Sequence, residues 1–279
     1  MQDELLSRAE GLARGRALRT QLPRTELARI TTEGRDPLGI LARQNATRVQ
    51  ELVPLRTERM AASAFAFYRG TAALMAADFA REPHTSILVP SCGDAHISNF
   101  GFFASPQRTL IFDLNDFDEA GSAPWEWDLK RLVASIVIGA RDARGQAVAD
   151  EAARLSVLAY ARALRAAVTA DPLRRYYAHF DAGTRLEGLD DASQRDLQQA
   201  IAAAEKRTGA RAARRLTTTD ADGALRFVEN PPVMTHADPE IQAVGAEAFR
   251  QYAESANVDI RLLLRQYSLR DLARRVVGV

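Results

Sequence analysis

Two short segments of this chain place carboxylates, amides and a histidine at close spacing. The first is Gly-Asp-x-His-x-x-Asn and contains Asp94, His96 and Asn99, while the second is Asn-Asp-Phe-Asp and contains Asp116 and Asp118. Carboxylate and amide oxygens are the ligands that Mg²⁺ prefers, together with water and substrate phosphates. A carboxylate that is not on the metal can accept or orient a hydroxyl proton. Together the two segments indicate phosphoryl transfer.

Other roles are open to each of these residues taken alone. Asp and Asn are common turn and helix-capping residues after strands. Without a second His or a nearby Cys at ligand spacing, His96 is expected to orient its loop through backbone hydrogen bonds rather than to bind a metal. Asp113 stands at the end of an apolar run and is expected to be structural.

Strands should position both segments. Ile87–Val89 and Thr109–Leu114 are short apolar runs with β-branched residues, and a polar segment follows each one. A loop after a strand holds a side chain on a fixed backbone while leaving it within reach of substrate. The apolar run after Trp127 predicts a helix that anchors the second loop to the core. Trp125 and Trp127 are expected to serve in packing, with the wall of a substrate pocket as the alternative.

These segments carry a resemblance to known families. GDAHISN resembles the catalytic loop of aminoglycoside-phosphotransferase-type and other kinase-like enzymes, and NDFDEAGSAPWEWDL resembles their metal-binding segment and the Asp-Leu pair that opens the next helix. More closely, FAFYRGTAALMAADFA, CGDAHISNFG, FDLNDFDEAGSAPWEWDLKRL and YSLRDLARRVVGV resemble, in order, the bacterial domain of unknown function 2252 family. That similarity runs from about Arg24 onward.

The resemblance implies a role for each matching residue. Asp94 would be the catalytic carboxylate, and Asn99 and Asp116 would hold Mg²⁺ against the phosphates. Asp118 would bind a second metal or support the first, and Asp128 would be a buried structural acid bonded back to the catalytic loop. The chain departs from the kinase-like pattern at Cys92, where many such enzymes carry His.

An arginine completes the candidate set. Arg69 lies beside Gly70 in the motif Phe-Tyr-Arg-Gly, and a guanidinium can bind phosphate or carboxylate through two parallel hydrogen bonds. With Asp94 and His96 it forms the predicted catalytic group.

The sequence contains no motif of an ATP-binding site. Members of the resembled family continue beyond a segment like RRVVGV into a glycine-rich stretch and a Lys-bearing strand, which resembles a nucleotide-binding lobe. Here Lys occurs only at Lys130 and Lys206, both on expected helices, and the sequence has no P-loop or Gly-x-Gly-x-x-Gly motif. We therefore expect Mg²⁺ and ATP as cofactors of a longer protein and a truncated, weakly active or inactive chain here.

Composition bounds the remaining possibilities. The 279 residues are 47% hydrophobic with a formal net charge of +1, which favours one sizeable core and gives no global attraction to nucleic acid or membrane. A single Cys excludes an internal disulfide framework, and no run approaches the length of a membrane span. The cytoplasm is the expected location, and the expected partner is a small-molecule or protein acceptor of unknown identity.

Hydrophobic spacing predicts a mostly helical chain. A hairpin or extended loop is expected over Thr217–Pro232, where Asp-Ala-Asp-Gly marks a turn. Pro54 is expected to end the second of the predicted helices. These helices are Asp3–Arg19, Pro37–Val53, Ser63–Arg81, Trp127–Arg141, Ala152–Ala170, Ala192–Thr208, Val244–Leu264 and Ser268–Val277.

The overall expectation is an α+β fold, mostly helical, that resembles the catalytic lobe of a kinase-like enzyme with a few short strands. Residues 1–36 would form an N-terminal helical arm and residues 37–279 the catalytic-lobe domain. The leading function is Mg²⁺-dependent transfer of a phosphoryl or nucleotidyl group to a hydroxyl. Three alternatives stay open: a metal-dependent phosphodiesterase or hydrolase, a non-catalytic binding module, and a truncated remnant without function.

Overall fold

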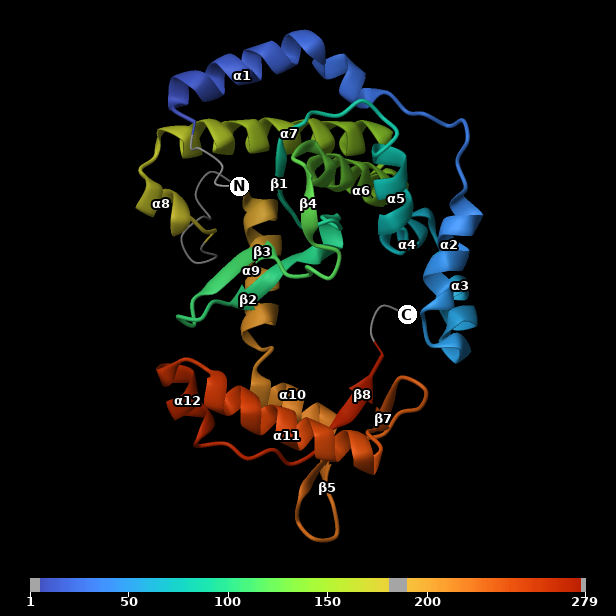
Figure 1. Ribbon diagram of the computed structural model, residues 1–279, viewed down its shortest axis with the longest axis vertical. Coiled ribbons are helices and arrows are strands. Elements are labelled where there is room, and N and C mark those ends of the chain that lie inside the picture. Colours follow the sequence, from blue (N-terminus) through green and yellow to red (C-terminus); the bar gives the residue numbers. More distant parts are fainter. Residues whose placement is uncertain (1–5, 181–189, 277–279) are drawn as a thin grey trace. The chain divides into compact units, whose positions relative to one another are not determined.

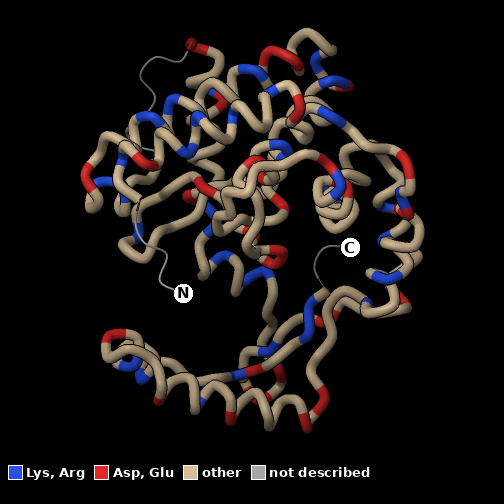
Figure 2. Tube along the Cα trace, turned by 45° about the horizontal axis from the view of Figure 1, so that its top comes forward, with Lys and Arg blue, Asp and Glu red and all other residues tan. Residues whose placement is uncertain are grey.

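The computed structural model describes residues 6–180 and 190–276, and its secondary structure is α+β and mostly helical (Figure 1). The chain divides into two compact units, Met1–Leu189 and Asp190–Val279, whereas the sequence analysis placed its division at residues 36 and 37. Within the described residues, no helix is long and apolar enough to cross a membrane. Both basic and acidic residues are scattered over the helices of each unit (Figure 2).

The first unit contains eight described α-helices, three 3-10 turns and four strands. The helices are α1 (Arg8–Gln21), α2 (Pro37–Ala46), α3 (Val53–Ala61), α4 (Ala64–Arg69), α5 (Ala72–Phe79), α6 (Glu126–Arg144), α7 (Gln146–Thr169) and α8 (Pro172–Tyr176). The 3-10 turns are η1 (Arg24–Ala28), η2 (Gln50–Leu52) and η3 (Ile97–Asn99), and the strands are β1 (Leu88–Ser91), β2 (Phe100–Ala104), β3 (Leu110–Leu114) and β4 (Gly121–Pro124).

The second unit has four described helices and two small antiparallel strand pairs. Its helices are α9 (Asp191–Glu205), α10 (Gly209–Leu216), α11 (Pro239–Ser255) and α12 (Val258–Leu264). Its strands are β5 (Thr217–Thr219), β6 (Leu225–Phe227), β7 (Met234–His236) and β8 (Ala273–Arg275), paired β5 with β6 and β7 with β8. The expected hairpin over Thr217–Pro232 is confirmed, because β5 and β6 are antiparallel.

Two antiparallel strand pairs hold the polar segments of the first unit. β1 pairs with β4 in the register Leu88 opposite Pro124, and β2 pairs with β3 in the register Phe102 opposite Phe112. The residues between β1 and β2 form one polar loop, and those between β3 and β4 form the other. The two strands expected from the sequence are therefore present, and hydrogen bonds join the two polar loops that follow them.

The long helices α6 and α7 pack along each other (Figure 1). Ala149 and Ala153 of α7 are buried, as is Ile136 of α6, so small side chains let the helices approach closely. Trp125, at the start of α6, stacks on Tyr160 of α7 with ring centroids 6.0 Å apart. The helix after the acidic segment thus fixes that segment to the core.

Several predicted helix boundaries are wrong. Pro54 does not end a helix but lies in the first turn of α3, where its missing N–H group costs no hydrogen bond. The predicted helix Ser63–Arg81 is divided into α4 and α5 at Gly70. There, the Gly70 N–H bonds to the carbonyls of Ala66 and Phe67 and closes α4.

The predicted last helix is also wrong over its described part. Ala273–Arg275 form strand β8, which pairs with β7, because the chain end finds a tertiary partner that helical spacing does not reveal. Val277 of that prediction and Asp3 of the first predicted helix lie outside the described residues. Val244–Leu264 forms α11 and α12 with a break at Ala256 and Asn257 rather than one helix.

Candidate functional site

The first turn of α6 holds the loop that follows β1. The carboxylate of Asp128 accepts hydrogen bonds from the backbone N–H groups of Cys92 and Gly93, at 2.7 and 3.0 Å. Gly93 has φ of +81°, a conformation that favours glycine, and a Cβ atom there would collide with the carbonyl of Glu119. Asp128 is half-buried rather than fully buried. A charged acceptor at the first turn of α6 therefore fixes the turn that precedes Asp94.

The loop between β3 and β4 is tied to the first loop through its backbone. The Asn115 N–H donates to the Asn99 carbonyl at 3.0 Å, and the Cys92 thiol donates to the Asp116 carbonyl at 3.0 Å. Burial, followed by the nearby charges of Asp128, Asp94 and Asp116, raises the pKa of the Cys92 thiol. The thiol is therefore a hydrogen-bonding donor, and the two polar segments lie side by side.

Asp94 is buried and forms an ion pair with a residue that the sequence analysis missed. The guanidinium of Arg131 on α6 places both Nε and Nη2 at 2.5 Å from Asp94 Oδ1. Arg131 is itself 2% exposed, donates to the Tyr68 carbonyl at 3.0 Å and lies over the Tyr68 ring. Burial raises the pKa of Tyr68 to about 12, and its hydroxyl donates to the Arg131 carbonyl at 2.8 Å.

His96 lies beside the same carboxylate. Its Nε2 is 3.6 Å from Asp94 Oδ2, while its buried Nδ1 has no partner among the described residues. Desolvation lowers the pKa of His96; the Asp94 charge opposes this shift, and the charges of Arg131 and Arg69 add to it. His96 also takes part in the backbone hydrogen bonds of its loop, because its backbone N–H donates to the Asp94 carbonyl at 2.8 Å and its carbonyl accepts from the Asn99 N–H at 2.9 Å.

Asn99 is buried and turns its amide toward the loop. Its Nδ2 donates to the backbone carbonyl of Asp94 at 2.8 Å, so Oδ1 is the atom left to face a cation. Asn99 closes η3, whose first residue Ile97 is fixed by a hydrogen bond from its N–H to the Ser135 hydroxyl at 2.9 Å. Both ends of the Asp94 loop are therefore held by α6.

The carboxylates of the second loop are exposed. Asp116, Asp118 and Glu119 follow one another on the turn between β3 and β4. Partial burial of the Glu119 carboxyl, and then the negative charges of Asp94, Asp116 and Asp118, raises the pKa of Glu119. Asp113 lies outside this group: it is exposed on β3, and its carboxylate accepts from the Leu114 N–H at 2.8 Å.

The donor set suits one kind of metal site. Nowhere in residues 6–180 and 190–276 do three or more His, Cys, Asp and Glu side chains gather closely enough to hold a metal ion. A Mg²⁺ site needs only one or two carboxylates, with water and phosphate as the other ligands. The exposed carboxylate of Asp116 and the Oδ1 of Asn99 are of this type.

Arg69 ends α4 and is exposed, close enough for its charge to lower the pKa of His96. Its position depends on a second arginine, because the buried Arg56 donates from Nη2 to the carbonyl of Gly70 at 2.9 Å. A Cβ atom at Gly70 would press on the Met60 side chain. Arg69 is therefore placed near the loop of Asp94, whereas Arg56 supports the chain behind it.

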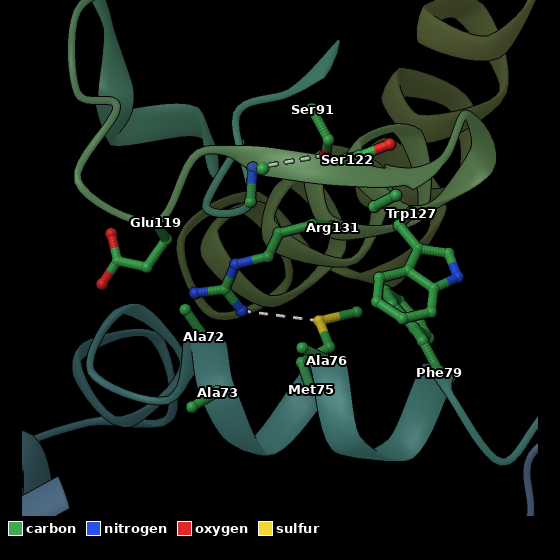
Figure 3. Close-up of a pocket in the computed structure, with 13 residues that line it drawn as sticks. Ala72, Ala73, Met75, Ala76, Phe79, Ser91, Glu119, Ser122, Trp127 and Arg131 are labelled. Carbon is green, nitrogen blue, oxygen red and sulfur yellow. Dashed lines mark hydrogen bonds between the residues drawn. The ribbon is translucent and has the colours of Figure 1, made fainter. Parts of the chain in front are cut away.

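A pocket of about 310 Å³ opens beside the two loops (Figure 3). One wall is the face of α5 with Ala72, Met75, Ala76 and Phe79, and Trp127 stands at the same end as Phe79. Gly93, Glu119 and Arg131 connect the pocket to the loops. Trp127 therefore lines the pocket, which is one of the two roles expected for it, and it also packs on Phe79 with ring centroids 5.8 Å apart.

Sequence reasoning missed the buried charges of α6. Arg131 and Glu126 are each 2% exposed, and Glu126 accepts from the N–H and the hydroxyl of Thr85, the latter at 2.8 Å. Helical spacing gave no signal for these charges: Glu126 is the first residue of α6, and Arg131 lies on the face of the helix opposite the apolar Leu129 and Val133. A buried charged side chain needs a partner, which only the tertiary structure identifies.

Comparison with known proteins gives one match. Residues 48–279 match the family model described as an uncharacterized protein conserved in bacteria, DUF2252. No curated protein and no solved structure matches the chain.

Proposed function

We propose that this chain, which belongs to the DUF2252 family of uncharacterized bacterial proteins, carries the catalytic loops of a Mg²⁺-dependent phosphotransferase acting on a hydroxyl. The observation that supports the proposal is the junction of the two polar loops. The loop that contains Asp94 and Asn99 is joined to the loop of Asp116 by the Asn115–Asn99 and Cys92–Asp116 hydrogen bonds. The likeness to a kinase-like catalytic lobe is part of this proposal and rests on the sequence motifs.

In this proposal Asp94 orients the acceptor hydroxyl. Arg131 occupies Oδ1 of Asp94, which leaves Oδ2 as the oxygen to receive a hydroxyl hydrogen bond. Phosphoryl transfer depends mainly on positioning and on stabilising charge, so a carboxylate held in one orientation suits the role. The apolar pocket beside Arg131 and Glu119 would take the body of the acceptor.

The metal would be held by Asn99 and Asp116, with Asp118 in support. When bound, Mg²⁺ neutralises phosphate charge and fixes the phosphates in line with the acceptor. Arg69, exposed at the end of α4, would bind a phosphate oxygen. ATP is the proposed donor, and the residues that would contact its base are not assigned.

The test combines a transfer assay with matched variants. Purified protein would be incubated with Mg²⁺ and ATP and a panel of small alcohols, and ³¹P NMR would follow new phosphate esters. Asp94→Asn and Asp116→Asn should each reduce transfer at least 100-fold, a loss typical of positioned catalytic groups. Asp113→Asn, an exposed acid on β3, is the control and should retain activity.

Two other outcomes would replace the proposal. Hydrolysis of a phosphodiester without ATP, lost in the same two variants, would assign a metal-dependent hydrolase. Absence of turnover, together with an unchanged Mg²⁺ response in Asp116→Asn, would assign a non-catalytic module.

A further inference from the structure

The second unit carries a concentration of positive charge that the proposed function does not use. A groove of about 820 Å³ lies between the end of α9 and α10 and is lined by Lys206, Arg207, Arg211 and Arg215. Its other lining residues are neutral: Gln199, Ala202, Ala203, Thr208 and Ala212. An acidic side chain is therefore absent from the lining of a cavity that holds four cations.

These cations differ from other arginines of the same unit in their partners. Arg226 pairs with Asp220 and Asp271, and Arg250 pairs with Glu247 and Glu254. By contrast, none of the four groove cations has an acidic partner among the described residues. Their charge is thus free to attract an anion from solution.

The geometry of α10 concentrates positive charge at the groove. Arg211 and Arg215 are four residues apart on α10, so their side chains lie on one face of the helix, and like charges at this spacing destabilise a helix. Thr208 caps α10 by accepting a hydrogen bond from the Arg211 N–H at 3.2 Å. The positive end of the helix dipole therefore points to the same region as Lys206 and Arg207. A bound polyanion would relieve this repulsion.

We infer that the α9–α10 groove binds a small polyphosphate, meaning two or more linked phosphate groups, either inorganic or at the end of a nucleotide. Several cations within one short helix and its preceding turn fit a compact chain of phosphates. The lining contains no aromatic ring, which is the usual platform for the bases of single-stranded nucleic acid. This inference is independent of the proposed function, because it uses no residue of the Asp94 site.

The experiment is a titration of the whole chain with inorganic tripolyphosphate in buffer that contains EDTA. Isothermal titration calorimetry measures the binding. Without Mg²⁺, the metal-dependent site of the first unit does not contribute. Arg211→Gln/Arg215→Gln should weaken binding at least 10-fold. The control Arg265→Gln/Arg274→Gln removes the same charge from exposed positions of the second unit and should stay within about twofold of the parent protein.

A parallel titration with ATP distinguishes an inorganic polyphosphate from a nucleotide as the ligand. Equal affinity for tripolyphosphate and ATP would assign recognition to the phosphates alone, and tighter binding of ATP would add a base contact; both support the inference. The melting temperature of each variant confirms folding, and Asp116→Ala should bind tripolyphosphate as the parent does.

Three results would overturn the inference. The first is no binding of tripolyphosphate at low salt, and the second is an equal loss in both double variants, which would indicate a general charge effect. The third is binding of a single-stranded RNA oligonucleotide but not of tripolyphosphate, which would make the groove a nucleic-acid surface. These three binding results depend only on the α9–α10 groove. They therefore keep their meaning even if the protein shows no phosphoryl transfer at the Asp94 site.

Discussion

Arg131 places two guanidinium nitrogens at 2.5 Å from a single carboxylate oxygen of Asp94, and both residues are buried. The other oxygen of Asp94 faces His96 at 3.6 Å. Because Arg131 is also bonded to the Tyr68 carbonyl, α4 and α6 hold the carboxylate together. The orientation of Asp94 is thus a property of the packed core rather than of its loop.

The first prediction concerns this ion pair. Arg131→Met should lower the free energy of unfolding by about 3–5 kcal/mol, because it leaves the Asp94 charge buried without its partner. Denaturant titration measures the change. Arg144→Met, at the exposed end of the same helix, should cost less than about 1 kcal/mol.

A double-mutant cycle identifies the cause. Arg131→Met combined with Asp94→Asn should recover part of the loss, because the unpaired charge is then absent. Strict additivity of the two substitutions would show that the pair is not coupled.

Asp128 gives the second prediction. Asp128→Ala should destabilise the first unit by about 2–4 kcal/mol, because the N–H groups of Cys92 and Gly93 lose a charged acceptor. Asp128→Asn retains one acceptor oxygen and should cost roughly half as much. Thermal or chemical unfolding measures both variants. An Asp128→Ala protein as stable as the parent would mean that the two hydrogen bonds contribute nothing.

The third prediction concerns the proposed metal. Mg²⁺ at about ten times its dissociation constant should raise stability by about 1.4 kcal/mol, or roughly 3–6 °C in melting temperature. Asp116→Ala should remove this rise and leave the metal-free protein as stable as before, since the side chain is exposed. Asp113→Ala should keep the full rise. A Mg²⁺ response that survives in Asp116→Ala would exclude Asp116 from the metal site.

The fourth prediction is a pH dependence of stability. Burial lowers the pKa of His96 below its usual 6.5, so the unfolded chain takes up a proton at a higher pH than the folded chain does. Stability is therefore lost as the pH falls from 6.5 toward the lowered value, by up to about 1.4 kcal/mol per pH unit, and the contribution is constant above 6.5.

His96→Gln should flatten this slope below about pH 6.5. His84→Gln, at an exposed position, should keep the slope of the parent. Unfolding measured at intervals across this range tests the prediction, and an unchanged slope in His96→Gln would assign the pH dependence to other groups.

Local sequence was sufficient for the parts of the structure that depend on local interactions. The apolar runs before Asp94 and before Asp116 predict β1 and β3, and the turn at Gly223 predicts the β5–β6 hairpin, because strand alternation and turn chemistry are read over a few residues. The spacing of the acidic motifs also predicts a site at Asp94, Asn99 and Asp116, and this assignment stays a prediction.

Only the tertiary structure decided which distant groups meet. It paired Arg131 with Asp94, joined the two loops through Asn115 and Asn99, and made a strand of Ala273–Arg275. The physical reason is that a buried charge and an unpaired strand edge each take whichever partner the packed chain brings within reach, and residues far apart in sequence supply that partner.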